Sequence, residues 1–188
     1  MNDTYIVTIG RPSYQKNPLF LVEVIKGVHD RHPEVKFMLL GVGYYSPDLD
    51  QMKQKISEYG LGDVVILKEW LSHDETLNLV KDSLFYLTVS RYEGLPLAVV
   101  EAMALGKCIV ASDVVGNSDC VRNGYNGLLL SLDVDTFVEA ICGLLDNPQQ
   151  IKAFGDNSRT LYESEFNIRN RIAMLEDIYK EVANKKAF

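Results

Sequence analysis

The stretch Leu84–Ser112 reads LFYLTVSRYEGLPLAVVEAMALGKCIVAS and contains the pattern of a strand, a helix and a second strand. Leu84–Val89 is a short apolar run rich in aromatic and branched side chains, which predicts a buried strand. Pro96–Leu105 opens with proline and is stopped by Gly106, as expected of a helix. Cys108–Ala111 is a second buried run. This order predicts a βα unit within a parallel sheet.

The same alternation runs through most of the chain. Further strands are expected at Tyr5–Ile9, Lys36–Leu40, Val64–Leu67 and Gly127–Leu130, and further helices at Pro18–Arg31, Pro47–Tyr59, His73–Lys81 and Asp133–Leu145. After Pro148 the alternation ends, and two helices are expected at about 148–163 and 168–184. The sequence therefore predicts an α/β fold with a doubly wound parallel sheet. We expect one domain over 1–188, with its core at about 4–147 and the two helices after it.

Composition excludes several functional classes. A net charge of −7 has the wrong sign for a surface that neutralises a nucleic-acid backbone, so no nucleic acid is expected as a partner. Cys108, Cys120 and Cys142 lie far apart without a CxxC pair, which favours neither a disulfide framework nor a zinc site. No apolar run reaches the roughly 18 to 20 residues of a membrane span, and the start MNDTYIVTIG lacks a signal pattern. We expect a cytoplasmic protein.

Charged residues gather in the segments that follow the predicted strands. In a parallel sheet these segments meet at one edge, where ligands bind. Arg11 and Lys16 follow the first strand, and Glu93 follows the fourth. The helix that opens at Pro96 would offer free N–H groups, those of Leu97 and Ala98, to an anion. The forked guanidinium of Arg11 and the compact ammonium of Lys16, beside such a helix, suit a diphosphate.

Two glutamates, Glu93 and Glu101, interrupt an otherwise apolar segment. A buried carboxylate needs water, a cation or a ligand. Glu101 lies about 7 Å along the helix from the expected anion site, which is about the reach from a phosphate to a ribose. Its two oxygens match two vicinal hydroxyls, and Glu93 would face a group on the far phosphate. The ligand inferred is a nucleoside diphosphate carrying a hydroxylated group. Under the alternative interpretation, all four charged residues are solvated surface side chains.

Several motifs in this order resemble one protein family. They are GRPSYQKNP at Gly10–Pro18, LLGVGYYSPDL at Leu39–Leu49, EGLPLAVVEAMALGKCIVASD at Glu93–Asp113, and VRNGYNGLLL at Val121–Leu130. Together they resemble the nucleotide-sugar-binding domain of retaining glycosyltransferases of family 4, which have the GT-B fold. The resemblance covers nearly the whole chain. It implies a Rossmann-like sheet that forms one half of a GT-B fold, with the acceptor-binding N-terminal domain absent from this chain.

The resemblance also implies roles for particular residues. Arg11 and Lys16 would hold the diphosphate and act in catalysis by neutralising the leaving group, while Glu93 would contact the donor sugar as it reacts. Glu101 would hold the ribose. The remaining donor contacts implied are Trp70, Leu71 and Ser72 near the nucleobase, and Leu95, Pro96, Leu97 and Ala98 where the helix begins.

Two departures from the family pattern affect the donor site. The family often has two glycines and a glutamate after the fifth strand, whereas Val115–Asp119 has one glycine and an aspartate. The frequent EGFG is EGLP here, so Pro96 lacks an amide that could donate to the ligand.

No metal or other cofactor is expected beside the donor substrate. The DxD triplets at Asp48–Asp50 and Asp133–Asp135 both open predicted helices, where aspartate is favoured as a cap. His29, His32 and His73 match no ligand pair on one helix face. The GxSxG and GxxxxGK[ST] motifs are absent, which excludes the hydrolase and P-loop classes that use them.

The function implied is donor binding in a glycosyltransferase that moves a hexose from a UDP-, GDP- or ADP-sugar to a glycan or lipid-linked acceptor, as in polysaccharide biosynthesis. The isolated domain would bind the donor without turnover. The alternatives are a nucleotide-sugar-binding GT-B module without transferase activity, a 2-epimerase and a phosphorylase. The expected partner is the missing acceptor domain, for which the final predicted helix carries an apolar stripe. A place at the inner face of the membrane remains open for the full enzyme.

Overall fold

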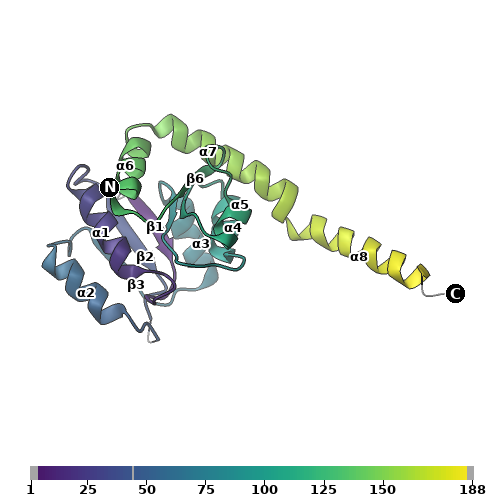
Figure 1. Cartoon of the computed structure of the whole chain (residues 1–188), viewed down its shortest axis with the longest axis horizontal. Coiled ribbons are helices and arrows are strands. Elements are labelled where there is room, and N and C mark those ends of the chain that lie inside the picture. The colour runs from purple at the N-terminus through teal and green to yellow at the C-terminus, as the bar shows by residue number, and fades with distance from the viewer. Residues whose placement is uncertain (1–3, 44, 186–188) are drawn as a thin grey trace.

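The computed structural model describes residues 4–43 and 45–185, which form a single parallel sheet covered by helices (Figure 1). The strands are β1 (Tyr5–Ile9), β2 (Lys36–Leu40), β3 (Val65–Lys68), β4 (Tyr86–Thr88), β5 (Ile109–Ser112) and β6 (Gly127–Leu130). Their order in the sheet is β3-β2-β1-β4-β5-β6, and every described pairing is parallel. This is the order of the Rossmann fold. The predicted doubly wound α/β fold is confirmed.

Helices cover both faces of the sheet. They are α1 (Pro18–His29), α2 (Leu49–Glu58), α3 (His73–Asp82), α4 (Leu97–Ala104), α5 (Val115–Cys120), α6 (Val134–Leu145), α7 (Pro148–Leu161) and α8 (Ile168–Lys185). One apolar core lies between the sheet and α1, α2 and α6, and a second lies between the sheet and α3, α4 and α5. Helix α7 contributes Phe154 to the first core and Leu161 to the second, so it joins the two layers.

The strands alternate between these two cores. In β1, Ile6 belongs to the core beneath α1, while Val7 belongs to the core beneath α4. The same alternation places Leu87 and Tyr86 of β4 on opposite faces. Because both faces are covered, these strands are continuous apolar runs, as is typical of parallel sheets.

Two local predictions were wrong. Helix α4 begins at Leu97, and Pro96 is its extended N-cap with φ −76° and ψ 91° rather than its first residue. Helix α5 follows β5 and was not among the predicted helices. Its six residues, VGNSDC, contain no strong helix former and no side-chain cap, so only the surrounding fold can specify it.

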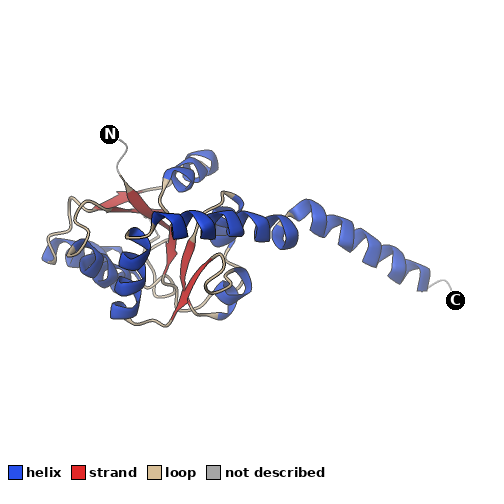
Figure 2. Ribbon diagram, turned by 90° about the horizontal axis from the view of Figure 1, so that it is seen from above, coloured by secondary structure: helices blue, strands red, loops and turns tan. Residues whose placement is uncertain are grey.

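The last helix extends away from the sheet (Figure 2). A π-helical turn, η1 (Tyr162–Phe166), separates it from α7. The apolar side chains along α8 are 47% to 70% exposed; they are Ile168, Ile172, Met174, Leu175, Ile178, Tyr179 and Val182. The predicted stripe is therefore uncovered within residues 4–43 and 45–185. Across those same residues, no helix is both long and apolar enough to cross a membrane.

Candidate functional site

The candidate site lies where the strand order reverses, between β1 and β4. Strand β1 pairs with β2 on one side and β4 on the other, so the loops that follow β1 and β4 diverge from this point. The loop after β1 is fixed to its neighbours at both ends. Gly10 N–H donates to Leu40 O at 2.9 Å, and Arg91 N–H donates to Gln15 O at 2.8 Å. In open α/β sheets, the crevice at such a switch point is where ligands bind.

Lys16 and Glu93 meet across this crevice as an ion pair. Lys16 Nζ donates to Glu93 Oε1 at 2.6 Å, and Gln15 Nε2 donates more weakly to Oε2 at 3.4 Å. The side chain of Glu93 is only 8% exposed, while that of Lys16 is 29% exposed. The cation thus stabilises a carboxylate that would be costly to bury alone. The sequence placed both residues at this edge but did not predict that they bind each other.

Arg11 and the start of α4 lie in the segments that follow β1 and β4, at the same edge of the sheet. Arg11 is exposed on the loop after β1 and makes no hydrogen bond or ion pair within the described residues. At α4, the first intrahelical bonds are those from Val99 and Val100 N–H to Pro96 O. The N–H groups of Leu97 and Ala98 precede them and have no acceptor in the helix. The N–H groups that were expected to be free therefore lack a helical acceptor even though the helix begins at Leu97 and not at Pro96.

Glu101 lies on the partly exposed side of α4, within reach of α3. Its side chain is 38% exposed, and Oε1 lies 3.8 Å from Nε2 of His73, the first residue of α3. That distance is too long for a hydrogen bond. Glu101 is thus available to a ligand in the crevice. Sequence reasoning placed the adjacent Ser72 in the site but missed the approach of His73 to Glu101, because that contact depends on how α3 packs against α4.

Tyr86, on β4, is buried in the core between the sheet and α4. Burial raises the pKa of its phenol, and the negative charges of Glu93 and Glu101 raise it further, despite an opposing hydrogen bond with the backbone of Ile9. Both carboxylates are therefore near one buried side chain. Nothing in its apolar strand pattern distinguished Tyr86 as part of the site.

Trp70 packs on the glycine loop that follows β2. A Cβ atom at Gly43 would lie 1.8 Å from Trp70 Nε1, so the indole occupies the space that any larger residue would need. Trp70 remains 66% exposed. Beside it, Leu71 is half-buried, and Ser72 is committed to the capping box of α3 through Glu75. The loops after β2 and β3 therefore pack against each other.

Helix α5 backs the loop that carries Glu93. A Cβ atom at Gly116 would lie 2.0 Å from Gly94 O, so the first turn of α5 touches the loop at Gly94. The buried amide of Asn117 donates to Ser112 O at 2.9 Å, and Ser112 Oγ donates to Ser90 O at 2.6 Å. These bonds tie α5 to the ends of β4 and β5. The family often has two glycines in this segment; this chain has one, Gly116, and it is the residue that contacts Gly94.

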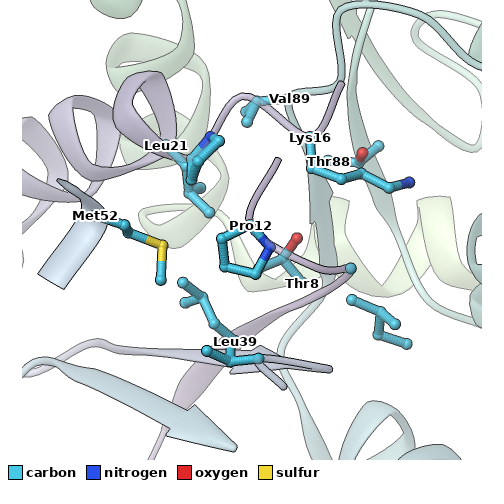
Figure 3. A pocket seen from close by; sticks show the side chains of 12 residues that line it. Thr8, Pro12, Lys16, Leu21, Leu39, Met52, Thr88 and Val89 are labelled. Carbon is cyan, nitrogen blue, oxygen red and sulfur yellow. The ribbon is translucent and has the colours of Figure 1, made fainter. Parts of the chain in front are cut away.

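A small cavity lies beneath the loop after β1 (Figure 3). Its lining includes Thr8, Pro12, Lys16, Leu21, Leu39, Met52, Thr88 and Val89. Its volume of about 20 Å³ accommodates a water molecule but no nucleotide.

The two DxD triplets differ in their roles. Asp133 caps α6 by accepting from Thr136 N–H at 2.8 Å, as predicted. Asp48 occupies the N-cap of α2 and Asp50 its first turn, as predicted, but the side chain of Asp48 makes no capping bond there. Within the described ranges, no cluster of three or more His, Cys, Asp or Glu side chains could hold a metal.

The sequence matches one family model over most of its length. That model, "Glycosyl transferases group 1", covers residues 1–161. The chain belongs to this family. It is 29% identical over 188 residues to the UDP-Gal:alpha-D-GlcNAc-diphosphoundecaprenol alpha-1,3-galactosyltransferase of Escherichia coli, covering 98% of this chain and 47% of that protein. It is 32% identical over 139 residues to the MMP alpha-(1->4)-mannosyltransferase of Mycolicibacterium hassiacum, covering 70% of this chain and 33% of that protein. The chain thus spans at most about half the length of these relatives.

Solved structures share the fold. Sucrose-phosphate synthase from Thermosynechococcus elongatus superposes with a TM-score of 0.88 at 23% identity, over 98% of this chain and 47% of that one. Anabaena HepE in complex with UDP-glucose superposes with a TM-score of 0.83 at 19% identity, over 97% of this chain and 49% of that one. At these identities the likeness shows the fold, which is the Rossmann-like half expected of a GT-B enzyme.

Proposed function

We propose that this chain is the donor-binding half of a retaining glycosyltransferase that transfers a hexose from a nucleoside-diphosphate sugar. The observation that carries the proposal is the Lys16–Glu93 pair beside the free N-terminus of α4, at the switch point of a sheet from this family. A cation, a carboxylate and unpaired N–H donors meet there. This combination fits a ligand with both phosphate oxygens and hydroxyl groups.

The proposed ligand extends along α4. Arg11, Lys16 and the N–H groups of Leu97 and Ala98 would hold the diphosphate. Glu101, further along α4 and partly exposed, would accept hydrogen bonds from the ribose hydroxyls. The base would then lie toward Trp70, Leu71 and Ser72 at the start of α3.

Glu93 would accept from hydroxyls of the donor sugar, with Leu95 and Pro96 at the rim. When the diphosphate binds, it competes with Glu93 for the ammonium of Lys16. Negative charge grows on the diphosphate as the glycosidic bond breaks, and Arg11, Lys16 and the start of α4 would stabilise that charge. These groups supply the positive charge, so we propose that no metal is required.

We further propose a UDP-hexose as donor and a glycan or lipid-linked acceptor. The names of the relatives support this choice: the Escherichia coli protein uses a UDP-galactose donor and a diphosphoundecaprenol-linked acceptor, and HepE was solved with UDP-glucose. The acceptor half would be contributed by another part of the same enzyme, packed against the uncovered apolar side chains of α8.

Ligand-induced stabilisation tests the proposal directly. Thermal unfolding would be followed with UDP, GDP, ADP and a panel of their sugars. A ligand at a hundredfold excess over its dissociation constant should stabilise the native state by about 2.7 kcal/mol. Glu101→Ala provides the matched variant, since it should weaken every one of these ligands. The absence of any shift with all of them would refute donor binding.

A second candidate is a nucleotide-sugar-binding module without turnover. The donor contacts proposed above would serve this candidate equally well, because they describe binding. Release of UDP from UDP-sugars, measured with and without a sugar acceptor, separates the two candidates. Binding without transfer by this chain, together with transfer by a longer protein that contains it, would support the first.

A further inference from the structure

Gln15 immediately precedes Lys16 in the loop after β1 and bonds to the loop that carries Glu93. Its backbone carbonyl accepts from Arg91 N–H at 2.8 Å, and its side-chain Nε2 donates to Tyr92 O at 3.1 Å. The same nitrogen reaches Glu93 Oε2 at 3.4 Å. Three consecutive residues of one loop therefore bond to a single residue of the other. Gln15 is not among the proposed donor contacts.

The neighbours of the Gln15 amide fix which way it points. A backbone carbonyl and an ionised carboxylate can only accept hydrogen bonds, so both must face the nitrogen, which has one proton for each. The contact with Tyr92 O falls within the ordinary range, whereas the contact with Glu93 Oε2 is longer than optimal. The bond between Gln15 and Glu93 is therefore weak in the ligand-free protein and has room to shorten.

The two oxygens of Glu93 have different partners. Oε1 accepts from Lys16 Nζ at 2.6 Å, and Oε2 faces Gln15. Within residues 4–43 and 45–185, these are the hydrogen bonds that the carboxylate makes. The side chain of Glu93 is nearly buried. Loss of the Lys16 ammonium would thus leave a costly charge that only the Gln15 amide supports.

We propose that Gln15 is a positioning residue, which holds the Glu93 carboxylate in place when the diphosphate takes the Lys16 ammonium. A neutral amide attracts a diphosphate less than an ammonium does, and this one is already bonded to Tyr92 O. Gln15 thereby lowers the cost of releasing Lys16 and keeps Glu93 directed at the donor sugar. The role in donor binding rests on the proposed function; the support of Glu93 without Lys16 does not.

A purely structural role would use the same hydrogen bonds, since Gln15 would then only brace the two loops through Arg91 and Tyr92. The two roles differ in what they couple to. A brace contributes the same stability whichever residues stand at positions 16 and 93. A support of Glu93 contributes more once the ammonium is removed and less once the carboxylate is removed.

Urea unfolding without ligand tests the support of Glu93. Gln15→Met keeps the unbranched side chain and removes the amide. The loss in free energy of unfolding should be about twice as large in the Lys16→Met background as in the wild-type protein, and smallest in the Glu93→Gln background. Gln54→Met is the matched control, because Gln54 of α2 donates to Glu58 at 2.7 Å away from the crevice. Its effect should be the same in all three backgrounds.

Calorimetric titration with UDP tests the role in donor binding. Gln15→Met should weaken UDP about three- to tenfold in the wild-type background. In the Glu93→Gln background it should hardly change UDP affinity, because no carboxylate competes for Lys16. Gln54→Met should leave UDP affinity unchanged in both. In NMR spectra, the Gln15 Nε2 protons should move downfield as UDP saturates the wild-type protein and the bond to Glu93 shortens.

Two results would overturn the inference. Equal losses of stability from Gln15→Met in all three backgrounds would make Gln15 only a brace, whether or not UDP binds. Equal losses of UDP affinity with and without the Glu93 carboxylate would remove its role in donor binding. Failure of the proposed function gives a different pattern, in which the stability loss depends on the background while UDP binds to none of the proteins. That pattern would retain Gln15 as the support of Glu93 and overturn the donor-binding step.

Discussion

Removing the ion pair between Lys16 and Glu93 should lower the free energy of unfolding of the ligand-free protein, by an amount that depends on how deeply the two side chains are buried. Lys16→Met keeps most of the aliphatic stem and removes the ammonium, leaving Glu93 with only the weak 3.4 Å bond from Gln15. Breaking a buried pair costs about 3 to 5 kcal/mol, whereas exposed pairs contribute about 0 to 1. Glu93 is 8% exposed and Lys16 29%, so we expect about 1 to 2 kcal/mol. For this chain length, that loss lowers the melting temperature by about 2 to 8 °C.

A double-mutant cycle isolates the pair itself. Glu93→Gln removes the charge that requires compensation, so the double variant with Lys16→Met should recover much of the loss. Urea unfolding followed by far-UV circular dichroism would give the four free energies. We expect a coupling of about 1 kcal/mol between the two positions. The same cycle on Lys152 and Asp156, an ion pair whose side chains are 77% and 67% exposed, is the control and should give almost none.

The outcome also bears on binding. If the two single losses simply add, the 2.6 Å contact contributes nothing, and the reasoning about Glu93 burial is wrong. If the coupling is present in the free protein and falls when UDP is saturating, Lys16 has transferred part of its interaction to the diphosphate. A coupling unchanged by bound UDP would refute the proposed competition for the Lys16 ammonium.

Three further perturbations address other parts of the site. Arg11→Ala should weaken UDP by about 1.5 to 3 kcal/mol and uridine hardly at all in calorimetric titrations, and equal losses would place Arg11 elsewhere. Glu101→Ala should weaken UDP about ten- to a hundredfold without affecting 2′,3′-dideoxy-UDP. Glu93→Gln removes the competitor for Lys16, so it should not weaken UDP but should reduce transfer by the complete enzyme; the reverse pattern would exchange the roles of the two glutamates. Gly116→Ala should destabilise the fold by about 1 to 3 kcal/mol in urea unfolding because the new methyl group meets Gly94 O, and a stabilised variant would contradict that contact.

The elements that the sequence predicted well are those whose signals are local. Apolar runs defined the strands, with Tyr5–Ile9 and Lys36–Leu40 matching to the residue. The loops that follow parallel strands meet at one edge whatever their composition, so Lys16 and Glu93 could be placed together before any coordinates. Their direct ion pair depends on side-chain rotamers across 77 residues of sequence separation, and no periodicity encodes it.

The features that were missed depend on contacts between loops. Helix α5 has poor helix formers and exists because Asn117 bonds back to Ser112 and Gly116 fits against Gly94. A single sequence shows that a glycine is present but not which backbone approaches it. The packing of Trp70 on Gly43 is the same kind of contact. The sequence shows a tryptophan and a glycine in separate loops, and only the structure shows that the indole leaves no room for a side chain at position 43.

The two glutamates in the apolar segment are stabilised by different means, and this difference supports different roles. Glu93 is nearly buried and its charge is balanced by Lys16, so a ligand that engages Glu93 must also change what Lys16 contacts. Glu101 is 38% exposed and has no hydrogen-bond partner within the described residues, so a ligand can bind it without breaking an existing bond. Under the proposed function, phosphate entry would perturb Glu93 and leave Glu101 unchanged. A carboxylate released from its cation as the diphosphate arrives is suited to the reacting sugar, and one that is always available is suited to the ribose.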